Sequence, residues 1–504
     1  MIGLARLSLL FLAVIELCLG QSLYPQTDTW NSSFTLTPDQ IAAADLSDAV
    51  AHDLQVAIRY ERSNNAGGRT VDDPFYDLPD DYDVLNPPPP GTILKVEEYT
   101  NVTLYTIPMS LAMSRFLYMT ETLNGTSAPA SGYVLWPYLP RKFANLTSAA
   151  QDGKKPKFPL LGLAHGSSGF TQACAPSNLR ALWGEVATTF PFVLAGYAVV
   201  APDYLGLGVA NTTSPYFILP SQANDYFRAI EAAQSAWPHL LSKEFVIAGQ
   251  SQGGGVSWAG AHRQAVRPVD GYLGTVAISP FPNVFEAVAS EDEAQVNGRM
   301  LAIARGMSSV YPGFELSEWL TDAGIARLRL MDELQACGDA SGVLFGAEEG
   351  KVQVLKDGWN STESALWFQD ISSMDGKPFA SPMMVLMGLD DGNAYEPSVT
   401  ASAKKTCDMY PGSHLEYYRM VTLMSALIQQ PLANILQENI THVPALYAGQ
   451  HLMMDWIRDR YAGLPLSSPG CTQTTLKPSR GYESADFDGF ADQTWNIVYN
   501  AYGI

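Results

Sequence analysis

The stretch EFVIAGQSQGGG, residues 244–255, decides the fold of this chain. Residues 245–248 form a short apolar run with β-branched members, which predicts a buried strand. The run leads into GQSQG, residues 249–253, a match to the pattern G-x-S-x-G, and the residues beyond it are typical of a helix start. Strand, sharp turn and helix are the context in which this pattern presents a nucleophilic serine. Ser251 is therefore the candidate nucleophile, and a tight turn without chemistry is the alternative.

Runs rich in β-forming residues recur on both sides of this stretch. The first ones are short, are separated by turn residues and predict antiparallel strands at residues 93–98, 103–107, 115–120 and 133–136. The later ones are unbroken apolar runs that predict interior strands at residues 158–164, 192–201, 275–279 and 383–387. An amphipathic helix is expected over residues 221–237. Strands that alternate with helices predict a mostly parallel α/β sheet with helices on both faces.

Two regions depart from this alternation. Residues 21–90 are polar, with helix expected around residues 38–62 and a loop rich in Pro and Asp near their end; we interpret them as an N-terminal extension packed on a catalytic domain, residues 91–504. Residues 282–378 are mostly helical in pattern, with helices expected at 284–290, 296–307 and 316–331. Since they fall between two sheet strands, we expect a cap or lid above the carboxyl ends of the strands, where sites of such sheets lie.

A serine nucleophile needs a base, and the chain has seven histidines. In folds with this serine turn, the acid and then the histidine follow the serine along the chain, which excludes His52, His165 and His239; a fourth, His262, lies too near in the same helix. His442 is favoured because it lies on a loop just before a helix expected over residues 444–461. His451, inside that helix, and His414, after a turn, remain alternatives.

The acid is expected at the end of the strand over residues 383–387. There the stretch GLDDG, residues 388–392, offers two adjacent carboxylates. The G-x-x-D arrangement usual at this corner selects Asp391, with Asp390 as the alternative and Glu396 as a third choice. A plain turn is the other interpretation of an Asp-Asp-Gly run.

Two backbone N–H groups are needed for the oxyanion of an acyl-transfer reaction. One is expected from Gln252, the residue after the nucleophile. The other is expected from the loop HGSSG, residues 165–169, with Gly166 or Ser168 as donor. This chemistry requires no cofactor, and the chain has no C-x-x-C or H-E-x-x-H pattern that would predict a metal site.

The first 20 residues are typical of a secretory signal, with Arg6, an apolar run over residues 7–15 and a plausible cleavage site before Gln21. Glu16 interrupts the run, and no later segment has 18 uninterrupted apolar residues, so we expect no transmembrane segment. The net charge of −21 argues against nucleic acid and anionic membrane surfaces as partners. We therefore expect a secreted, extracellular protein, and we expect a monomer.

Cysteines and sequons agree with secretion. Four cysteines follow the signal segment and predict two disulfides; of three connectivities we favour Cys174–Cys337 and Cys407–Cys471, and free buried thiols are the alternative. Seven N-x-S/T sequons predict glycans on the surface, at Asn31, Asn101, Asn124, Asn145, Asn211, Asn360 and Asn439.

With these residues in place, the chain resembles the fungal secretory lipases, the yeast lipase A type of α/β-hydrolase. The carrying features span almost the whole mature chain: DPFY at 73–76, PGTIL at 90–94, CAPS at 174–177, GYAVV at 196–200, PDY at 202–204, the Ser251 turn, and WIRDRYAG at 456–463 before Cys471. The resemblance implies an α/β-hydrolase fold and ester hydrolysis, with lipid substrates expected under a helical lid. It also implies His442 as the catalytic histidine and supports the two disulfide pairings.

One departure from that family is the 51-residue separation of Asp391 and His442, within which residues 415–438 are expected to form an extra amphipathic helix. The leading hypothesis is an extracellular serine lipase or esterase acting on ester or lipid substrates, at an oil–water interface if they are lipids. A serine peptidase or an acyltransferase that uses the same residues is the alternative, because a fold does not determine a function. A non-catalytic binding relative is the third hypothesis.

Overall fold

The computed structural model describes residues 34–144, 156–183, 189–210, 212–288, 293–346, 352–421, 440–467 and 469–477. The expected signal segment, residues 1–20, and four sequon asparagines lie outside the described residues: Asn31, Asn145, Asn211 and Asn439. The other three, Asn101, Asn124 and Asn360, are exposed.

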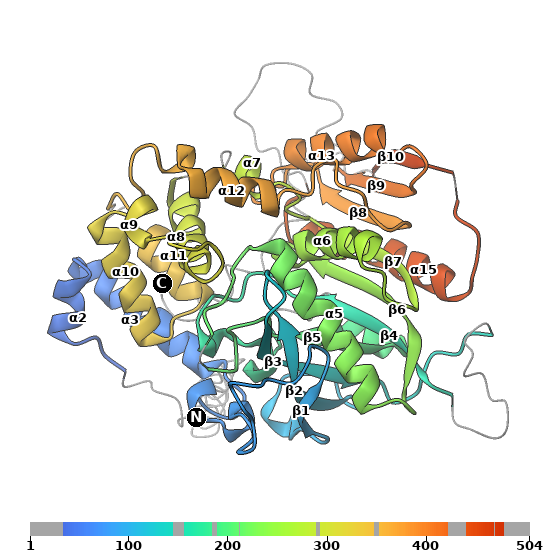
Figure 1. Ribbon diagram of the computed structural model, residues 1–504, viewed down its shortest axis with the longest axis horizontal. Coiled ribbons are helices and arrows are strands. Elements are labelled where there is room, and N and C mark those ends of the chain that lie inside the picture. The colour runs from blue at the N-terminus through green and yellow to red at the C-terminus, as the bar shows by residue number, and fades with distance from the viewer. Residues whose placement is uncertain are drawn as a thin grey trace, which may run out of the picture.

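A twisted sheet forms the centre of the described structure (Figure 1), and its ten strands lie in the order β1-β2-β3-β5-β4-β6-β7-β8-β9-β10. The strands are β1 (Ile93–Glu97), β2 (Ala112–Glu121), β3 (Ser127–Trp136), β4 (Phe158–Ala164), β5 (Ala198–Pro202), β6 (Leu241–Gln250), β7 (Tyr272–Ile278), β8 (Met383–Gly388), β9 (Leu415–Met420) and β10 (Cys471–Leu476). The first three pair antiparallel with their neighbours, and all pairs from β5 to β10 are parallel. The predicted mostly parallel α/β sheet is confirmed.

Side chains of the central strands belong to two apolar cores, one on each face of the sheet, because successive side chains point to opposite faces. In β6, Phe245 and Ile247 belong to one core, and Val246 and Ala248 to the other. The first core is covered by α5 (Leu219–Ala236), α6 (Gln252–Val266) and α13 (Glu396–Met409). The second is covered by α4 (Thr189–Leu194), α14 (Pro444–Ala448) and α15 (Gln450–Tyr461). Burial on both faces explains why these strands are continuous apolar runs in the sequence.

Among the described residues, six α-helices lie between β7 and β8, and we call them the cap helices. They are α7 (Val284–Val288), α8 (Glu293–Val310), α9 (Leu316–Trp319), α10 (Asp322–Leu334), α11 (Gly338–Gly346) and α12 (Glu363–Ser372). The N-terminal helices α2 (Pro38–Ala43) and α3 (Asp48–Ser63) lie beside α10 and α11, at one side of the sheet (Figure 1). Leu54, Ala57 and Ile58 of α3 are buried there, so the extension shares the apolar core.

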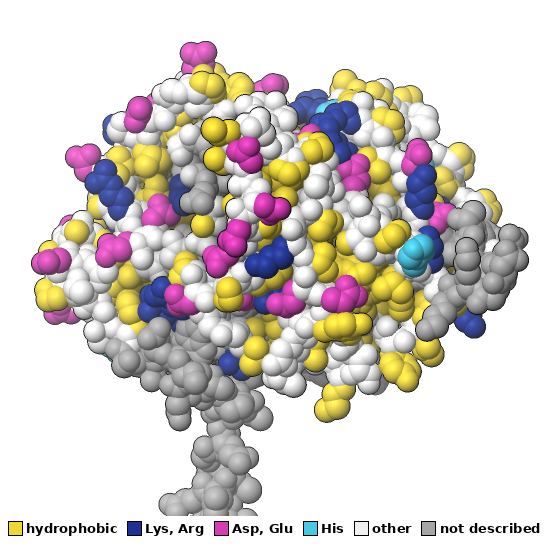
Figure 2. Space-filling view, turned by 60° about the horizontal axis from the view of Figure 1, so that its bottom comes forward, with side chains coloured by type: hydrophobic (Ala, Val, Ile, Leu, Met, Phe, Trp, Pro, Cys, Tyr) yellow, Lys and Arg dark blue, Asp and Glu magenta, His cyan; other side chains and the backbone are white. Residues whose placement is uncertain are grey.

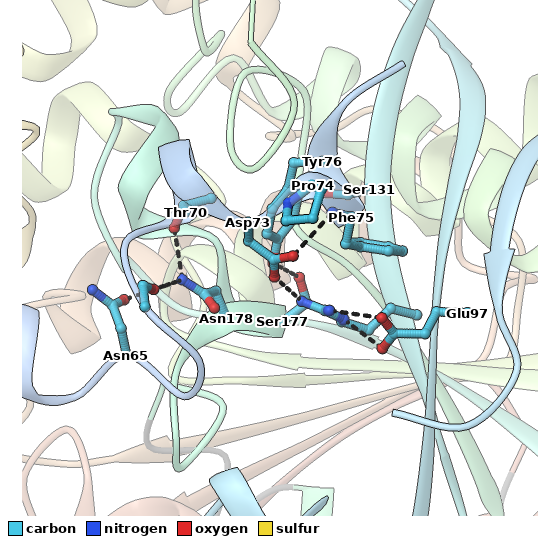
Figure 3. A network of polar contacts seen from close by, with 12 residues as sticks. Asn65, Thr70, Asp73, Pro74, Phe75, Tyr76, Glu97, Ser131, Ser177 and Asn178 are labelled. Carbon is cyan, nitrogen blue, oxygen red and sulfur yellow. Dashed lines mark hydrogen bonds and ion pairs between the residues drawn. The ribbon is translucent and has the colours of Figure 1, made fainter. Parts of the chain in front are cut away.

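Polar contacts fasten the chain that follows α3 to the sheet and to the loop near Ser177 and Asn178 (Figure 3). The Asn178 Nδ2 donates to the Gly68 carbonyl and to Thr70 Oγ1, both at 2.9 Å. Arg115 of β2 pairs with Asp73 at 2.7 Å and with Glu97 of β1 at 2.9 Å. Charge-assisted hydrogen bonds of this kind fix a segment in one geometry.

The two favoured disulfides are both present. The Cys174–Cys337 bridge joins the loop after β4 to the residue before α11, and the Cys407–Cys471 bridge joins α13 to β10. They span 163 and 64 residues of sequence respectively.

Removing the first bridge is expected to destabilise the protein more than removing the second. In the chain-entropy model the longer loop corresponds to about 5 kcal/mol of unfolding free energy and the shorter to about 4 kcal/mol. Cys174 is also fully buried, whereas Cys407 is half-buried, so packing losses act in the same direction. Urea denaturation of Cys174→Ala/Cys337→Ala, with Cys407→Ala/Cys471→Ala as the matched control, measures the difference. A larger loss in the control pair would contradict the loop-length explanation.

Two of the expected strands are wrong in part or whole. Residues 192–194 belong to α4, and only residues 198–202 form β5. An apolar run suits a buried helix as well as a strand, and Gly196, with φ +96°, ends the helix between them. Residues 103–107 form no strand, because the Asn101 side chain accepts from the Thr103 N–H and caps a short 3-10 turn.

Three expected helices also differ. Residues 415–420 form β9, since their side chains alternate between the two cores while the backbone pairs with β8 and β10; residues 422–438 lie outside the described part of the chain. Residues 444–461 form two helices, α14 and α15, that meet at Gly449, where a Cβ would come within 3.1 Å of Leu386. Residues 316–331 likewise form two helices, because Thr321 caps a new start for α10.

The surface agrees with the acidic composition. On the face in Figure 2, Asp and Glu side chains are interspersed with Lys and Arg, and its described part has no broad basic patch. Among the described residues, no helix has the length and apolar character that a membrane crossing requires.

Candidate active site

Ser251 lies at the turn between β6 and α6 with φ +62° and ψ −125°. A non-glycine residue with this backbone is strained, and such strain at a strand-to-helix turn exposes a nucleophilic hydroxyl. The Ser251 N–H donates to the Ile278 carbonyl of β7 at 2.9 Å, which fixes the turn to the sheet.

The glycines of the G-x-S-x-G pattern are required by close backbone contacts. A Cβ on Gly249 would lie 2.2 Å from the Gly253 carbonyl oxygen, and a Cβ on Gly253 would lie 2.0 Å from that of Ala164. Neither contact involves a side chain that can move away. The pattern is therefore a steric requirement of packing this turn against β4.

Three side chains from separate loops form one hydrogen-bonded chain at this turn. The His442 Nε2 lies 2.8 Å from the Ser251 Oγ, and the His442 Nδ1 lies 2.8 Å from the Asp391 Oδ2. His442 precedes α14, and its carbonyl accepts a hydrogen bond from Ser279 Oγ at 3.2 Å. The ring of Phe281 packs edge-on against the His442 imidazole, with 6.3 Å between the two ring centroids. A base in this position can take the serine proton.

Asp391 is buried and orients the imidazole. Burial by itself would raise its pKa, but the attraction and hydrogen bond of His442 outweigh it, so the pKa of Asp391 is lowered. The other carboxylate oxygen accepts from the backbone N–H of Asn393 at 3.0 Å and of Ala394 at 2.9 Å. The group therefore stays ionised and holds a proton on His442 Nδ1.

The alternative acids and bases lie elsewhere. Asp390 is exposed, and Glu396 pairs with Arg419 at 2.7 Å. His414 contacts Glu416 at 2.7 Å, and His451 is exposed on α15. Of the sequence candidates, the structure brings together Ser251, Asp391 and His442.

Two of the expected oxyanion donors lie beside the serine. The backbone of Gln252 begins α6 directly after Ser251, and a Cβ on Gly166 would lie 3.6 Å from the Ser251 Cβ. The Gln252 side chain is held by a hydrogen bond from Ser167 Oγ at 3.0 Å. Ser168 lines a neighbouring cavity but not the cavity that contains Ser251. The geometry thus favours Gly166 over Ser168 as the second donor.

His165, the first residue of this loop, packs against Asp203 and Tyr204. Its Nε2 lies 3.2 Å from the Asp203 carbonyl oxygen, and its ring stacks on Tyr204 at 4.1 Å. Burial lowers the pKa of His165 to about 4, so the ring is neutral at physiological pH. This agrees with a structural role for His165.

A cavity of about 460 Å³ contains Ser251 and His442. Aromatic side chains from the loops and the cap line it, namely Phe170, Tyr216, Phe281 and Phe345. The Arg299 guanidinium of α8 lies over the Phe281 ring at 4.7 Å. The sequence alone did not predict these lining residues, because nothing in an apolar or helical pattern tells which side chains face the site. Within the described ranges, no cluster of three or more His, Cys, Asp or Glu side chains suits a metal ion.

Comparison with known proteins relates the chain to others by fold. No family model matches the sequence, and no curated protein matches it. Candida antarctica lipase A in its closed state superposes with a TM-score of 0.61 at 16% identity, over 87% of this chain and 98% of that chain. The rice cell wall degrading esterase LipA from Xanthomonas oryzae superposes with a TM-score of 0.54 at 16% identity, over 74% of this chain and 100% of that chain. The chain therefore has the α/β-hydrolase fold.

Proposed function

We propose that the protein hydrolyses carboxylic esters, with Ser251 as nucleophile, His442 as general base and acid, and Asp391 as the residue that orients His442. The observation that carries the proposal is the chain of two 2.8 Å contacts from Asp391 through His442 to a serine on a strained turn. That arrangement is recognised by geometry and role in unrelated folds. The fold shared with a lipase and an esterase adds support.

The reaction follows from the positions of these groups. Ser251 Oγ attacks the ester carbonyl carbon while His442 Nε2 takes its proton, and the carbonyl oxygen gains negative charge. We assign the stabilisation of this charge to the backbone N–H groups of Gln252 and Gly166. The alcohol leaves with the proton from Nε2. Water then attacks the acyl-enzyme, gives a proton to Nε2, and releases the acid with Ser251 restored.

The finer proposal is a secreted lipase or esterase for esters with apolar acyl groups. The aromatic lining of the cavity around Ser251 suits hydrocarbon, since apolar pockets bind by burying such surface. Two disulfides suit an oxidising, extracellular compartment.

The test is hydrolysis of p-nitrophenyl esters from acetyl to palmitoyl, together with labelling by a fluorophosphonate. We expect ester turnover and one label, mapped to Ser251 by peptide mass spectrometry. Labelling of Ser251 without any ester turnover would replace hydrolysis by the peptidase or acyltransferase alternative. Neither turnover nor labelling would contradict a catalytic role and favour a binding relative.

A further inference from the structure

A second cavity, of about 520 Å³, adjoins the one that contains Ser251. The two cavities adjoin beside the nucleophile and its loop, because six residues line both: Gly166, Trp183, Gln250, Cys337, Asp339 and Val443. Each cavity has the volume of a site for a small ligand. An ester has an acyl arm and an alcohol arm on either side of the bond that breaks, and the residues shared by the two cavities include Gln250 and Gly166 beside Ser251.

The N-terminal extension forms one side of the second cavity. We call residues 58–71 the N-terminal wall; Ile58 and Glu61 of α3 and Val71 beyond it line the cavity. Leu446 of α14 also lines the cavity, as does Ala181, from the loop that is hydrogen-bonded to the N-terminal wall. Residues that are far apart in the sequence therefore line one space.

Hydrogen bonds hold the N-terminal wall in place. The Glu61 carboxylate accepts from the Cys337 N–H at 2.9 Å and from the Ala340 N–H at 2.8 Å, at the start of cap helix α11. The Ala66 N–H donates to the Asn178 carbonyl at 2.7 Å, and Asn65 forms an isolated antiparallel β-bridge with Leu179. The N-terminal wall is thus hydrogen-bonded both to the start of cap helix α11 and to the loop around Asn178.

The lining of the cavity indicates what it binds. Most of its surface is apolar, from side chains such as Ile58, Leu179 and Leu446. Polar and charged residues also line it, among them Glu61 and Arg62. Two polar groups lie close to the shared boundary: Ser168 Oγ and Gln250 Nε2 are buried and have no hydrogen-bond partner among the described residues. Buried polar groups are normally paired, so an unpaired pair of donors beside a cavity points to a ligand that supplies an acceptor.

We propose that this second cavity binds one arm of the substrate ester, a mainly hydrocarbon group that carries an oxygen acceptor near the scissile carbonyl, and that the N-terminal wall decides which esters are cleaved. The proposal rests on the proposed ester hydrolysis and adds a binding site to it. Diesters of a polyol and esters of hydroxy acids have this chemistry, because a second oxygen lies a few bonds from the first.

The test fills the cavity from the N-terminal wall. Val71→Trp adds bulk to the lining, and Val96→Trp on β1 is the matched control, because Val96 is 38% exposed against 41% for Val71 and lies outside both cavities. Two substrate series are measured: p-nitrophenyl esters with lengthening acyl chains, and acetates of lengthening alcohols. We expect the ratio of kcat/KM for the longest to the shortest member of one series to fall roughly tenfold or more in Val71→Trp. In Val96→Trp both ratios are expected to match those of the wild type.

The outcomes separate the two arms and the two proposals. A fall in the acyl series assigns the cavity to the acyl arm, and a fall in the alcohol series assigns it to the alcohol arm. Unchanged ratios in both series, in a Val71→Trp protein that is still labelled by the fluorophosphonate, would overturn the proposal while leaving ester hydrolysis intact. If Val71→Trp does not fold, Ala181→Trp adds bulk to the same cavity from the loop beside the N-terminal wall. A wild-type protein with neither turnover nor label would instead refute the proposed function itself.

Discussion

Replacing Ser251 by alanine is expected to lower kcat/KM for ester hydrolysis by roughly 10⁴–10⁶-fold without unfolding the protein. The loss is large because the serine oxygen forms the covalent bond to the acyl group. Among the described residues, no other hydroxyl is hydrogen-bonded to His442 Nε2, which lies 2.8 Å from Ser251 Oγ. Alanine keeps a Cβ on the same strained backbone, so the turn itself is preserved. Steady-state kinetics on a p-nitrophenyl ester, with circular dichroism for the fold, measures both parts.

Ser257→Ala is the matched control for this variant. Ser257 lies on α6, is fully buried, and its Oγ has no hydrogen-bond partner among the described residues, so its removal takes away a hydroxyl of the same kind at no catalytic position. Activity near the wild-type level is expected there. Full activity in Ser251→Ala would end the assignment of Ser251 as nucleophile.

The second large effect is expected at the acid, where two adjacent aspartates give a direct comparison. Asp391→Asn is expected to lower kcat by roughly 10⁴-fold, as loss of the orienting carboxylate does in other serine hydrolases. The amide oxygen would accept from the Asn393 and Ala394 N–H groups, which leaves the NH₂ facing His442 Nδ1. That donor favours the tautomer with the proton on Nε2, which cannot take a proton from Ser251.

Asp390→Asn changes the same atoms one residue earlier, on an exposed side chain, and is expected to leave kcat within a few-fold of the wild type. Steady-state kinetics of both variants on one ester decides between the two acids. Equal losses in the two variants, or the larger loss at Asp390, would exclude the proposed role of Asp391.

Local patterns were enough to predict the parts of the fold that depend on neighbours in sequence. The β6–Ser251–α6 unit could be predicted because the strand, the glycines and the helix all lie within residues 241–266. The choice of His442 and Asp391 needed only the order along the chain and the ends of two elements. The deciding signals were local turns and the ends of elements, taken in the order that this fold imposes along the chain.

Features set by distant parts of the chain could not be predicted in this way. β9 resembles an amphipathic helix until β8 and β10 pair with it from both sides. β10 has a largely exposed, polar sequence, CTQTTL, that carries no apolar signal of a strand. The contacts of Glu61 with Cys337 and Ala340 join residues 276 and 279 positions apart, and no periodicity in α3 indicates that its polar side faces a cavity.

That long-range contact has a consequence for biosynthesis. The ribosome makes α3 first, yet the Ala340 N–H that donates to the Glu61 carboxylate is made 279 residues later. At a typical 5–20 residues per second, the helix waits roughly 15–60 s for its partner. During that interval the cap cannot cover Leu54, Ala57 and Ile58 of α3, which are buried in the folded protein. Transiently exposed apolar surface of this kind is prone to aggregate, which is one reason why chaperones exist. The N-terminal extension is therefore translated early, but it can complete its contacts with the cap only after residue 340 has been made.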